Sequence, residues 1–260
     1  MKPLITLTTD LGIRDFYLAS IKGRILTQLP DAQIIDINNS VTQHSVLEAA
    51  YVLKNVLRDF PDGTIHIVGV GAGAINDIEH LIIEYRNQFI VTANNGLISL
   101  ISDEKPTYVG VVNVDPNLEV LTFPARDLYA PIAVHLARGG KAQEITIPLP
   151  KPVTSFYLPP TVGDGFIKGT VQYVDAFGNA ISNIHKSLIQ EVGNGAEFII
   201  GFRQKGFNIK HLSKRYSDVI ASERLALYNS AGYLEVAINQ GHAANLMGLH
   251  MDETVLISFL

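Results

Sequence analysis

The first 140 or so residues alternate strand-length apolar runs with helix-length amphipathic patterns, and this alternation constrains the fold more than any other feature. The strand-length runs are Leu4–Thr8, Gln33–Ile37, Thr64–Val68, Leu81–Glu84, Gln88–Thr92, Leu97–Ile101 and Tyr108–Val112. Apolar residues recur at helical spacing in residues 16–29, 46–57 and 128–136. Such alternation predicts a sheet with helices on its faces, and a ligand site beyond the carboxyl ends of the strands.

A stretch with prolines at 148, 150, 152, 159 and 160 ends this pattern. Prolines at this density indicate an extended linker or a domain boundary. Beyond it come short strand-like runs, namely Phe166–Tyr173, Glu197–Phe202, Leu225–Tyr228, Tyr233–Val236 and Thr254–Phe259. We therefore expect an α/β domain over residues 1–147, a linker over 148–162 and an all-β barrel, or a small sandwich, over 163–260.

Composition narrows the classes of function. A net charge of -5 without a dense basic cluster argues against nucleic-acid binding. The absence of cysteine excludes disulfides and thiolate catalysis, and the eight histidines lack the spacing of a metal site. No run approaches the ~20 apolar residues of a membrane span. Since the first apolar run is also too short for a signal peptide, we expect a cytoplasmic protein with no membrane partner.

A glycine-rich segment, Gly69–Ala74, follows the third strand-like run, where an α/β protein usually carries reactive side chains. It holds no charged group before Asp77. A dinucleotide fingerprint would open a helix, whereas Leu81–Glu84 is strand-like, and the Gly-Lys-Ser/Thr of a phosphate-binding loop is missing. A turn with unusual backbone angles explains the glycines adequately.

Asp10 lies just beyond the first strand-like run, in the sequence Thr8-Thr9-Asp10-Leu11-Gly12. A carboxylate there can accept hydrogen bonds from the two vicinal hydroxyls of a ribose. The alternative is a cap for the next helix. Asp15 is the better placed cap for the helix that contains Phe16 and Tyr17, which leaves Asp10 for a ligand.

Two segments of the C-terminal half combine polar groups with an aromatic ring. Asp175, Phe177 and Asn179 offer an acid, a ring that can stack on a planar base, and an amide that can read the edge of the base. An ordinary turn with Phe177 in the core explains them equally well. The segment Asn229–Glu235 pairs an amide and a hydroxyl with glycine, and a turn followed by a half-buried strand is its simpler interpretation.

Taken together, these segments resemble the S-adenosylmethionine (SAM) hydroxide adenosyltransferases and their relatives, the fluorinases and chlorinases. The similarity covers nearly the whole chain. It is carried by Leu7–Gly12, Lys22-Gly23, Ile35–Ile37, Phe60–His66, Asn94–Leu97, Thr122–Asp127, Asp175–Asn179 and Asn229–Glu235.

The resemblance implies a homotrimer in which each ligand lies between the N-terminal domain of one subunit and the C-terminal domain of its neighbour. In the N-terminal domain, Asp10 matches the acid that holds the ribose hydroxyls. Asp15, Phe16 and Tyr17 match a segment near the same ligand, and His44 stands in the place of a tryptophan beside the ribose. Phe123 and Ala125 are expected ligand neighbours for a different reason, because with Gly69 and Ala72 they could line a small dry pocket for a halide. In the C-terminal domain, Asp175 matches the acid near the methionine amine, Phe177 and Asn179 match adenine-side residues, and Ser230 matches a contact to the methionine carboxylate.

The chain departs from its relatives where they activate the nucleophile. Hydrolytic members carry an Asp-Arg-His triad, and the corresponding positions here are Gly69, Asn76 and Pro124. Halogenating members carry a tyrosine and a threonine, which correspond to Gly69 and Ala72. Their arginines near the methionine end correspond to residues 231 and 238, which are Ala and Ile here. Neither apparatus is present. Four charged or basic residues nearby in sequence are possible substitutes: Asp77, His80, Arg126 and Asp127.

We therefore expect a SAM-binding protein that displaces methionine from the 5′ carbon, giving adenosine or a 5′-substituted adenosine. Water is the first nucleophile to test and a halide the second, and neither requires a metal or a cofactor beyond SAM. A non-catalytic binder or sensor of SAM or adenosine is the alternative. A third hypothesis is a structural trimer that has lost its ligand.

Overall fold

The structure is a computed structural model, and it describes residues 2–73, 78–114, 122–155, 158–204 and 206–260. The chain divides into two compact units, residues 1–156 and 157–260. None of the described helices is long and apolar enough to cross a membrane. The predicted linker over 148–162 starts at the last residue of β7 and ends inside β8, and the predicted domain limits stay a prediction.

Within the described residues of the N-terminal unit, seven strands form one sheet in the order β2-β1-β3-β5-β4-β6-β7. They are β1 (Leu4–Thr9), β2 (Gln33–Asn38), β3 (Ile65–Gly69), β4 (His80–Tyr85), β5 (Gln88–Ala93), β6 (Tyr108–Val112) and β7 (Thr146–Pro148). Strands β2, β1, β3 and β5 are parallel, whereas β4, β6 and β7 join by antiparallel pairing. The carboxyl ends of β1, β3 and β5 therefore share one edge of the sheet.

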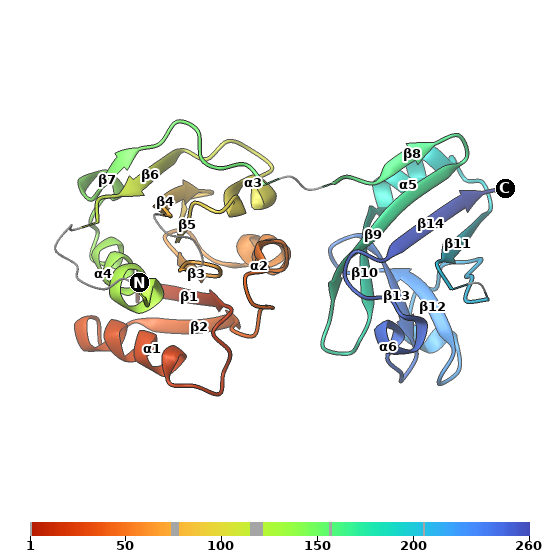
Figure 1. Ribbon diagram of the computed structural model, residues 1–260, viewed down its shortest axis with the longest axis horizontal. Helices are drawn as coiled ribbons and strands as arrows, with labels where there is room; N and C mark the ends of the chain where they lie inside the picture. Colours follow the sequence, from red (N-terminus) through yellow and green to blue (C-terminus); the bar gives the residue numbers. More distant parts are fainter. Residues whose placement is uncertain (1, 74–77, 115–121, 156–157, 205) are drawn as a thin grey trace. The chain divides into compact units, whose positions relative to one another are not determined.

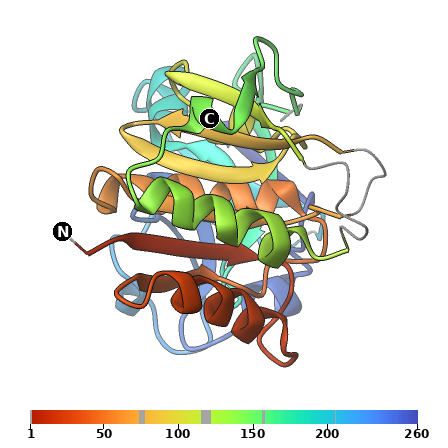
Figure 2. The ribbon, with the colours of Figure 1, turned by 90° about the vertical axis from the view of Figure 1, so that its left-hand side faces the viewer.

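Helices cover both faces of this sheet (Figure 1). They are α1 (Tyr17–Gln28), α2 (Val46–Val56), α3 (Leu97–Ile101) and α4 (Ala130–Ala137), with short turns η1 (Leu57–Asp59), η2 (Ala125–Tyr129, π-helical) and η3 (Ala142–Glu144). Helices α1 and α4 lie side by side on one face (Figure 2), and α2 and α3 pack on the other. The predicted α/β fold is confirmed.

Each face is covered because the strands carry apolar side chains on both sides. Ile5 and Leu7 of β1 are fully buried in the core beneath α1 and α4. Val68 and Ile90 point to the opposite face and pack beneath α2 and α3. Such two-sided burial is typical of parallel strands between helical layers.

The C-terminal unit is a strongly curled, antiparallel half-barrel sheet, as predicted for this half of the chain (Figure 1). Its strands are β8 (Thr161–Gly163), β9 (Phe166–Val174), β10 (Ala180–His185), β11 (Phe198–Phe202), β12 (Arg224–Tyr228), β13 (Tyr233–Ile238) and β14 (Thr254–Phe259). Its helical segments are α5 (Lys186–Gly193), η4 (Tyr216–Asp218) and α6 (Ala243–Met247). The sheet order is β11-β14-β9-β10-β13-β12, with β8 paired to β9.

One run predicted as strand-like is a helix. Leu97–Ile101 forms α3, which follows Gly96 in a left-handed conformation (φ 90°) and buries Leu97, Ile98 and Ile101. A short, wholly apolar run has no periodicity to distinguish a buried strand from a buried helix. Its packing against α2 therefore decided its conformation.

Candidate functional site

Asp10 directly follows β1 and connects the loops that follow β2 and β3. Its Oδ2 accepts hydrogen bonds from the backbone N–H of His44 at 2.9 Å and of Gly71 at 3.0 Å. Its side chain is 10% exposed. Within the described part of the chain, no group donates to the other oxygen, Oδ1. Asp10 therefore does not cap the next helix, and one oxygen of a fixed carboxylate can accept ligand hydrogen bonds.

His44 and Gly71 reach Asp10 through unusual backbone conformations. Both lie in the left-handed region, with φ of 64° and 61°. Glycine adopts such angles at little cost, whereas histidine does so less often. The imidazole of His44 is 68% exposed, with Nδ1 3.8 Å from Asp10 Oδ2. The predicted site residues Asp10 and His44 are thus neighbours, and the glycine-rich segment supplies one of the two donors.

The prediction that Asp15 caps the first helix is wrong. The N-cap residue of α1 is Phe16, and no side chain makes a capping hydrogen bond there. Because the helix starts at Tyr17, the cap position falls on a residue with no side-chain acceptor, and Asp15 is left exposed.

Three aromatic rings gather near the start of α1. The ring centroids of Phe16 and Tyr17 are 4.5 Å apart, and those of Tyr17 and Phe123 are 5.2 Å apart with an edge-on geometry. Phe123 is buried, whereas Phe16 is 65% exposed. The structure therefore brings these predicted residues together. The ring of Phe16 remains exposed on the N-terminal unit.

Arg126 and Asp127, two of the residues considered as substitutes for the triad, bind each other. The guanidinium donates to both carboxylate oxygens at 2.7 Å and lies 5.0 Å from the ring centroid of Phe123. The hydrogen bond from Arg126 lowers the pKa of Asp127. Both oxygens of Asp127 are thus already engaged.

Gly69 and Pro124, two of the positions that match the triad, each have small residues as neighbours. A Cβ placed on Gly69 would lie 3.1 Å from Cβ of Ala125 and 3.4 Å from Cγ2 of Thr9. A Cβ on Gly73 would lie 4.0 Å from Cδ of Pro124. The third position, Asn76, and the nearby Asp77 fall outside the described residues.

A chain of polar side chains fixes the loop after β2 against the end of β1. Lys22 Nζ donates to Asp36 Oδ2 at 2.6 Å, and Asn39 Nδ2 donates to Asp36 Oδ1 at 2.9 Å. Thr9 Oγ1 donates to Asn39 Oδ1 at 2.9 Å. The sequence motifs around residues 22 and 36 thus meet beside the candidate site, a connection that no local pattern could predict.

In the C-terminal unit, Asp175 organises its own turn. Its Oδ1 accepts from the backbone N–H of Phe177 at 3.0 Å and of Asn179 at 2.8 Å, and its Oδ2 accepts from Asn179 Nδ2 at 2.9 Å. Asn179 is buried. Phe177 is 78% exposed, so the alternative that placed its ring in the core is wrong. The ring is held at the surface of its unit beside an anchored carboxylate.

Ser230 lies in a second turn, between β12 and β13. Asn229 Oδ1 accepts from the backbone N–H of Ala231 and of Tyr233, both at 3.0 Å. This is the turn that the sequence favoured, and Ser230 is exposed on it.

A buried carboxylate at Glu235 was missed as a site feature. It is 3% exposed, and its Oε1 accepts a hydrogen bond from the hydroxyl of Tyr216 at 2.7 Å. Burial raises the pKa of Glu235, the bond from Tyr216 opposes this shift, and the charge of Asp175 adds to it. Strand alternation predicts that Glu235 shares a face with Tyr233, but it cannot predict the hydrogen bond to Tyr216 on η4.

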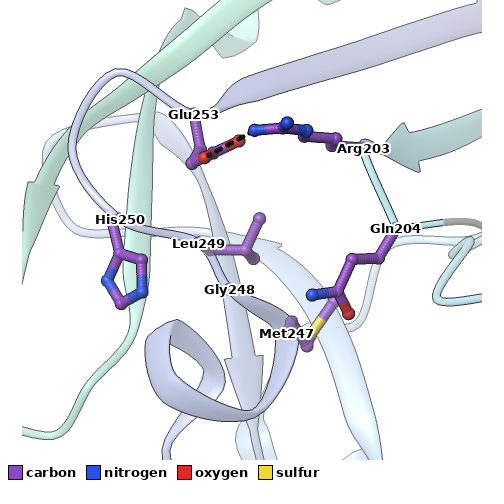
Figure 3. Close-up of a pocket in the computed structure, with 7 residues that line it drawn as sticks. All are labelled: Arg203, Gln204, Met247, Gly248, Leu249, His250 and Glu253. Atoms are coloured by element: carbon purple, nitrogen blue, oxygen red, sulfur yellow. Dashed lines mark ion pairs between the residues drawn. The ribbon is translucent and has the colours of Figure 1, made fainter.

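A separate cavity of about 420 Å³ lies in the C-terminal unit, between the end of β11, the end of α6 and the segment before β14 (Figure 3). Its two formal charges, Arg203 and Glu253, lie 3.7 Å apart and pair with each other. None of the predicted site residues lines it. Among the residues that the structure describes, no group of three or more His, Asp or Glu side chains is placed to hold a metal.

Two family profiles match this chain. Residues 5–146 match the SAM hydroxide adenosyltransferase N-terminal domain, and residues 169–256 match the C-terminal domain of the same family. The matches include β1 and the Asp10 loops in the first profile, and the Asp175 and Asn229 turns in the second.

Curated relatives and solved structures agree with the profiles. The chain is 27% identical to an (R)-S-adenosyl-L-methionine hydrolase of Methanocaldococcus jannaschii, over 98% of this chain and 95% of the relative. It is 26% identical to a fluorinase of an Actinoplanes species, over 98% and 97%. An uncharacterized conserved protein from Thermotoga maritima is 27% identical, with a TM-score of 0.87 over 98% of this chain and 99% of that one.

Proposed function

The chain belongs to the SAM hydroxide adenosyltransferase family, and we propose that it binds SAM and transfers the 5′-deoxyadenosyl group to a small nucleophile. A lone pair of the nucleophile forms the new bond to C5′ as the C5′–S bond breaks and its electrons pass to the sulfur of methionine. With water the product is adenosine and one proton is released, whereas with a halide no proton moves.

The anchored carboxylate of Asp10 is the observation that carries this proposal. Two backbone N–H groups fix its Oδ2, and Oδ1 is left to accept from ligand hydroxyls. Tyr17 and Phe123 supply aromatic surface close to the start of α1. We assign Asp10 to the ribose, and Asp15, Phe16, Tyr17, His44, Phe123 and Ala125 to its surroundings.

In the C-terminal unit, we assign Asp175 to the amine of methionine. A carboxylate has about four lone-pair sites, and three hydrogen bonds within the turn occupy only part of them. Phe177 is exposed and available to stack on adenine, beside Asn179. Ser230 lies on an exposed turn and is assigned to the methionine carboxylate.

We expect the reaction with water to be slow, because Gly69 and Pro124 carry no acid or base. Losing a general base typically costs ~10²–10⁴-fold. Orientation of the reactants supplies much of the acceleration in a displacement whose leaving group is already a sulfonium. We therefore propose a slow reaction with water or a reaction with a different nucleophile. The missing side chains favour a non-catalytic binder as the second candidate.

The test is to incubate the purified protein with SAM in water, chloride, bromide or fluoride, and to separate adenosine, 5′-halogenated adenosine and methionine by chromatography. ¹⁸O-labelled water shows whether the 5′ oxygen comes from solvent. S-adenosylhomocysteine, a thioether without the sulfonium, is the control substrate and should give no product.

Calorimetry separates the two candidates. Binding of SAM without product in any of these media would support the binder over the enzyme. Absence of binding to both SAM and adenosine would overturn both. Asp10→Ala and Asn179→Ala should each abolish the binding of the wild-type protein.

A further inference from the structure

His80 lies in the same row of the sheet as Gly69, two strands away. Thr9 pairs with Gly69, and the pairing of Val68 with Thr92 places Gly69 beside Ala93. Ala93 in turn pairs with His80. Neighbouring strands are about 4.8 Å apart, so the Cα atoms of Gly69 and His80 are separated by about 10 Å. Directly paired residues share a face, and only the methyl group of Ala93 lies between them in the row.

The π-helical turn η2 covers this row. At its start, Ala125 lies against Gly69. At its end, the hydroxyl of Tyr129 lies 2.8 Å from Nδ1 of His80, and the two rings meet edge-on with centroids 5.4 Å apart. π-Helical turns occur frequently at functional sites. One turn therefore contacts both the Gly69 end and the His80 end of the row.

The two buried side chains settle where the imidazole proton lies. Tyr129 is fully buried, and in the described part of the chain its hydroxyl has His80 Nδ1 as its sole partner. If the hydroxyl donates to Nδ1, the tyrosine is satisfied and the imidazole proton resides on Nε2. The opposite arrangement leaves the buried phenol proton unpaired, which costs about 1–3 kcal/mol, whereas Nε2 has no described partner in either arrangement. The first arrangement is favoured.

The Nε2–H of His80 then lacks an acceptor. The side chain is 3% exposed, and no described residue lies within hydrogen-bonding distance of Nε2. Burial lowers the pKa of His80, so the imidazole is neutral near pH 7. Nε2 itself is not among the fully buried polar atoms without a partner in the described residues, which are Thr8 Oγ1 and Thr92 Oγ1. This N–H is therefore left to donate to an acceptor from outside the protein.

We propose that the Nε2–H of His80 donates a hydrogen bond to the attacking nucleophile and positions it, a role that rests on the proposed adenosyl transfer. The acceptor is a small lone-pair donor, either water or a halide ion. His80 keeps its proton throughout. With water the proton released on bond formation passes to solvent, and with a halide none is released.

The experiment compares kcat and KM for SAM in wild type, His80→Leu and His80→Gln, each with water alone and with added chloride, bromide or fluoride. Losing a donor aimed at reacting atoms typically lowers rates by 10²–10³-fold. We expect His80→Leu to lower kcat at least about 10-fold with KM changed less than about 3-fold. His80→Gln keeps an N–H donor and should recover part of the loss. The medium in which the loss appears identifies the nucleophile.

His66→Gln is the matched control. His66 is a second buried histidine of the same sheet, on the opposite face, and both of its nitrogens already have partners, Thr6 and Gln88. This variant should lower stability and leave kcat per folded molecule unchanged. Thermal unfolding of every variant checks that the proteins compared are folded.

Two results would overturn the role of His80. One is a wild-type kcat retained in His80→Leu, which would leave the proposed function standing. The other is independent of turnover: ¹⁵N imidazole spectra that show His80 protonated on Nδ1, because Nε2 would then have no proton to donate. Failure of the wild type to bind SAM or adenosine is a different outcome, because it removes the proposed function itself together with the nucleophile that His80 would hold.

Discussion

At the scale of single residues, Gly69 and Ala125 pack so closely that there is little room for a side chain at position 69. A side chain at 69 would place its Cβ 3.1 Å from that of Ala125, so the neighbour has to give by a few tenths of an ångström. Gly69→Ala should lower the free energy of unfolding by about 1–3 kcal/mol, as overpacking does. Ala125→Gly in the same chain should return part of that loss, and urea unfolding of the two single variants and the double variant measures the coupling.

Gly23→Ala is the control for this cycle. Gly23 lies inside α1, and a Cβ there would meet nothing within 4 Å. The change should raise stability by about 0.5–1 kcal/mol through helix propensity, and its effect should be independent of Ala125→Gly. Strict additivity of Gly69→Ala with Ala125→Gly would show that the two residues do not compete for space.

His66 gives the protein a defined sensitivity to acid. Its imidazole is buried between Thr6 and Gln88, and burial lowers its pKa from 6.5 to about 4. Between these values the unfolded chain binds the proton more readily than the folded one. Stability should therefore be complete above about pH 6.5 and should fall by up to about 3 kcal/mol as the pH approaches 4.

Urea unfolding at half-unit steps from pH 7.5 to pH 4 measures this slope. His66→Gln should lose most of it, although it will be less stable at neutral pH because a buried pair is broken. The pKa of His80 is lowered in the same direction, so a smaller slope should persist in the variant. Equal slopes in the two proteins would assign the acid sensitivity to other groups.

At the scale of secondary-structure elements, the turn after β9 holds its shape through one carboxylate. Asp175 accepts three hydrogen bonds from Phe177 and Asn179. Asp175→Ala should lower the free energy of unfolding by about 1–3 kcal/mol, since it leaves donors without partners. Asp175→Asn keeps one acceptor oxygen and should cost less. Chemical unfolding without ligand measures both, and an unchanged midpoint in Asp175→Ala would refute this structural role.

Elements with clear periodicity were predictable from the sequence, and those with buried polar residues were not. The strand β10 was missed because Ser182 and Asn183 interrupt its apolar pattern. In the structure both are buried: Ser182 Oγ donates to the carbonyl of Leu234, and Asn183 Oδ1 accepts from the N–H of Thr170. The register also shifts between Ile181 and Ser182. Tertiary partners, not local pattern, make this segment a strand.

The candidate site was also predictable only in part: the position of Asp10 was predictable from the sequence, whereas its hydrogen-bond donors were not. The position of Asp10 follows from the end of a strand, because parallel strands present their carboxyl ends at one edge. Its two N–H donors come from loops 34 and 61 residues away in sequence, and no local signal links them. The same holds for the bond between Tyr129 and His80, 49 residues apart.

At the scale of the whole molecule, the two compact units have separate cores, and each carries part of the predicted ligand site. Asp10 and the aromatic residues lie in the first unit, and Asp175 and Ser230 lie in the second. The family resemblance supports a homotrimer that joins such halves from different chains. We expect light scattering to give a mass three times the 28.4 kDa of one chain. A monomer in solution would contradict this expectation.

Complementation between variants tests whether two chains share each site. Asp10→Ala and Asn179→Ala homotrimers should bind neither SAM nor adenosine. In a mixed trimer, about one in three sites built from two subunits receives both intact residues. Co-expression with two different affinity tags, followed by sequential purification, isolates the mixed species for calorimetry. Recovered binding in these trimers, and none in simple mixtures of the preassembled variants, is the expected result. Mixed trimers that bind nothing would place both residues of each site in one chain, because no intact pair can then form.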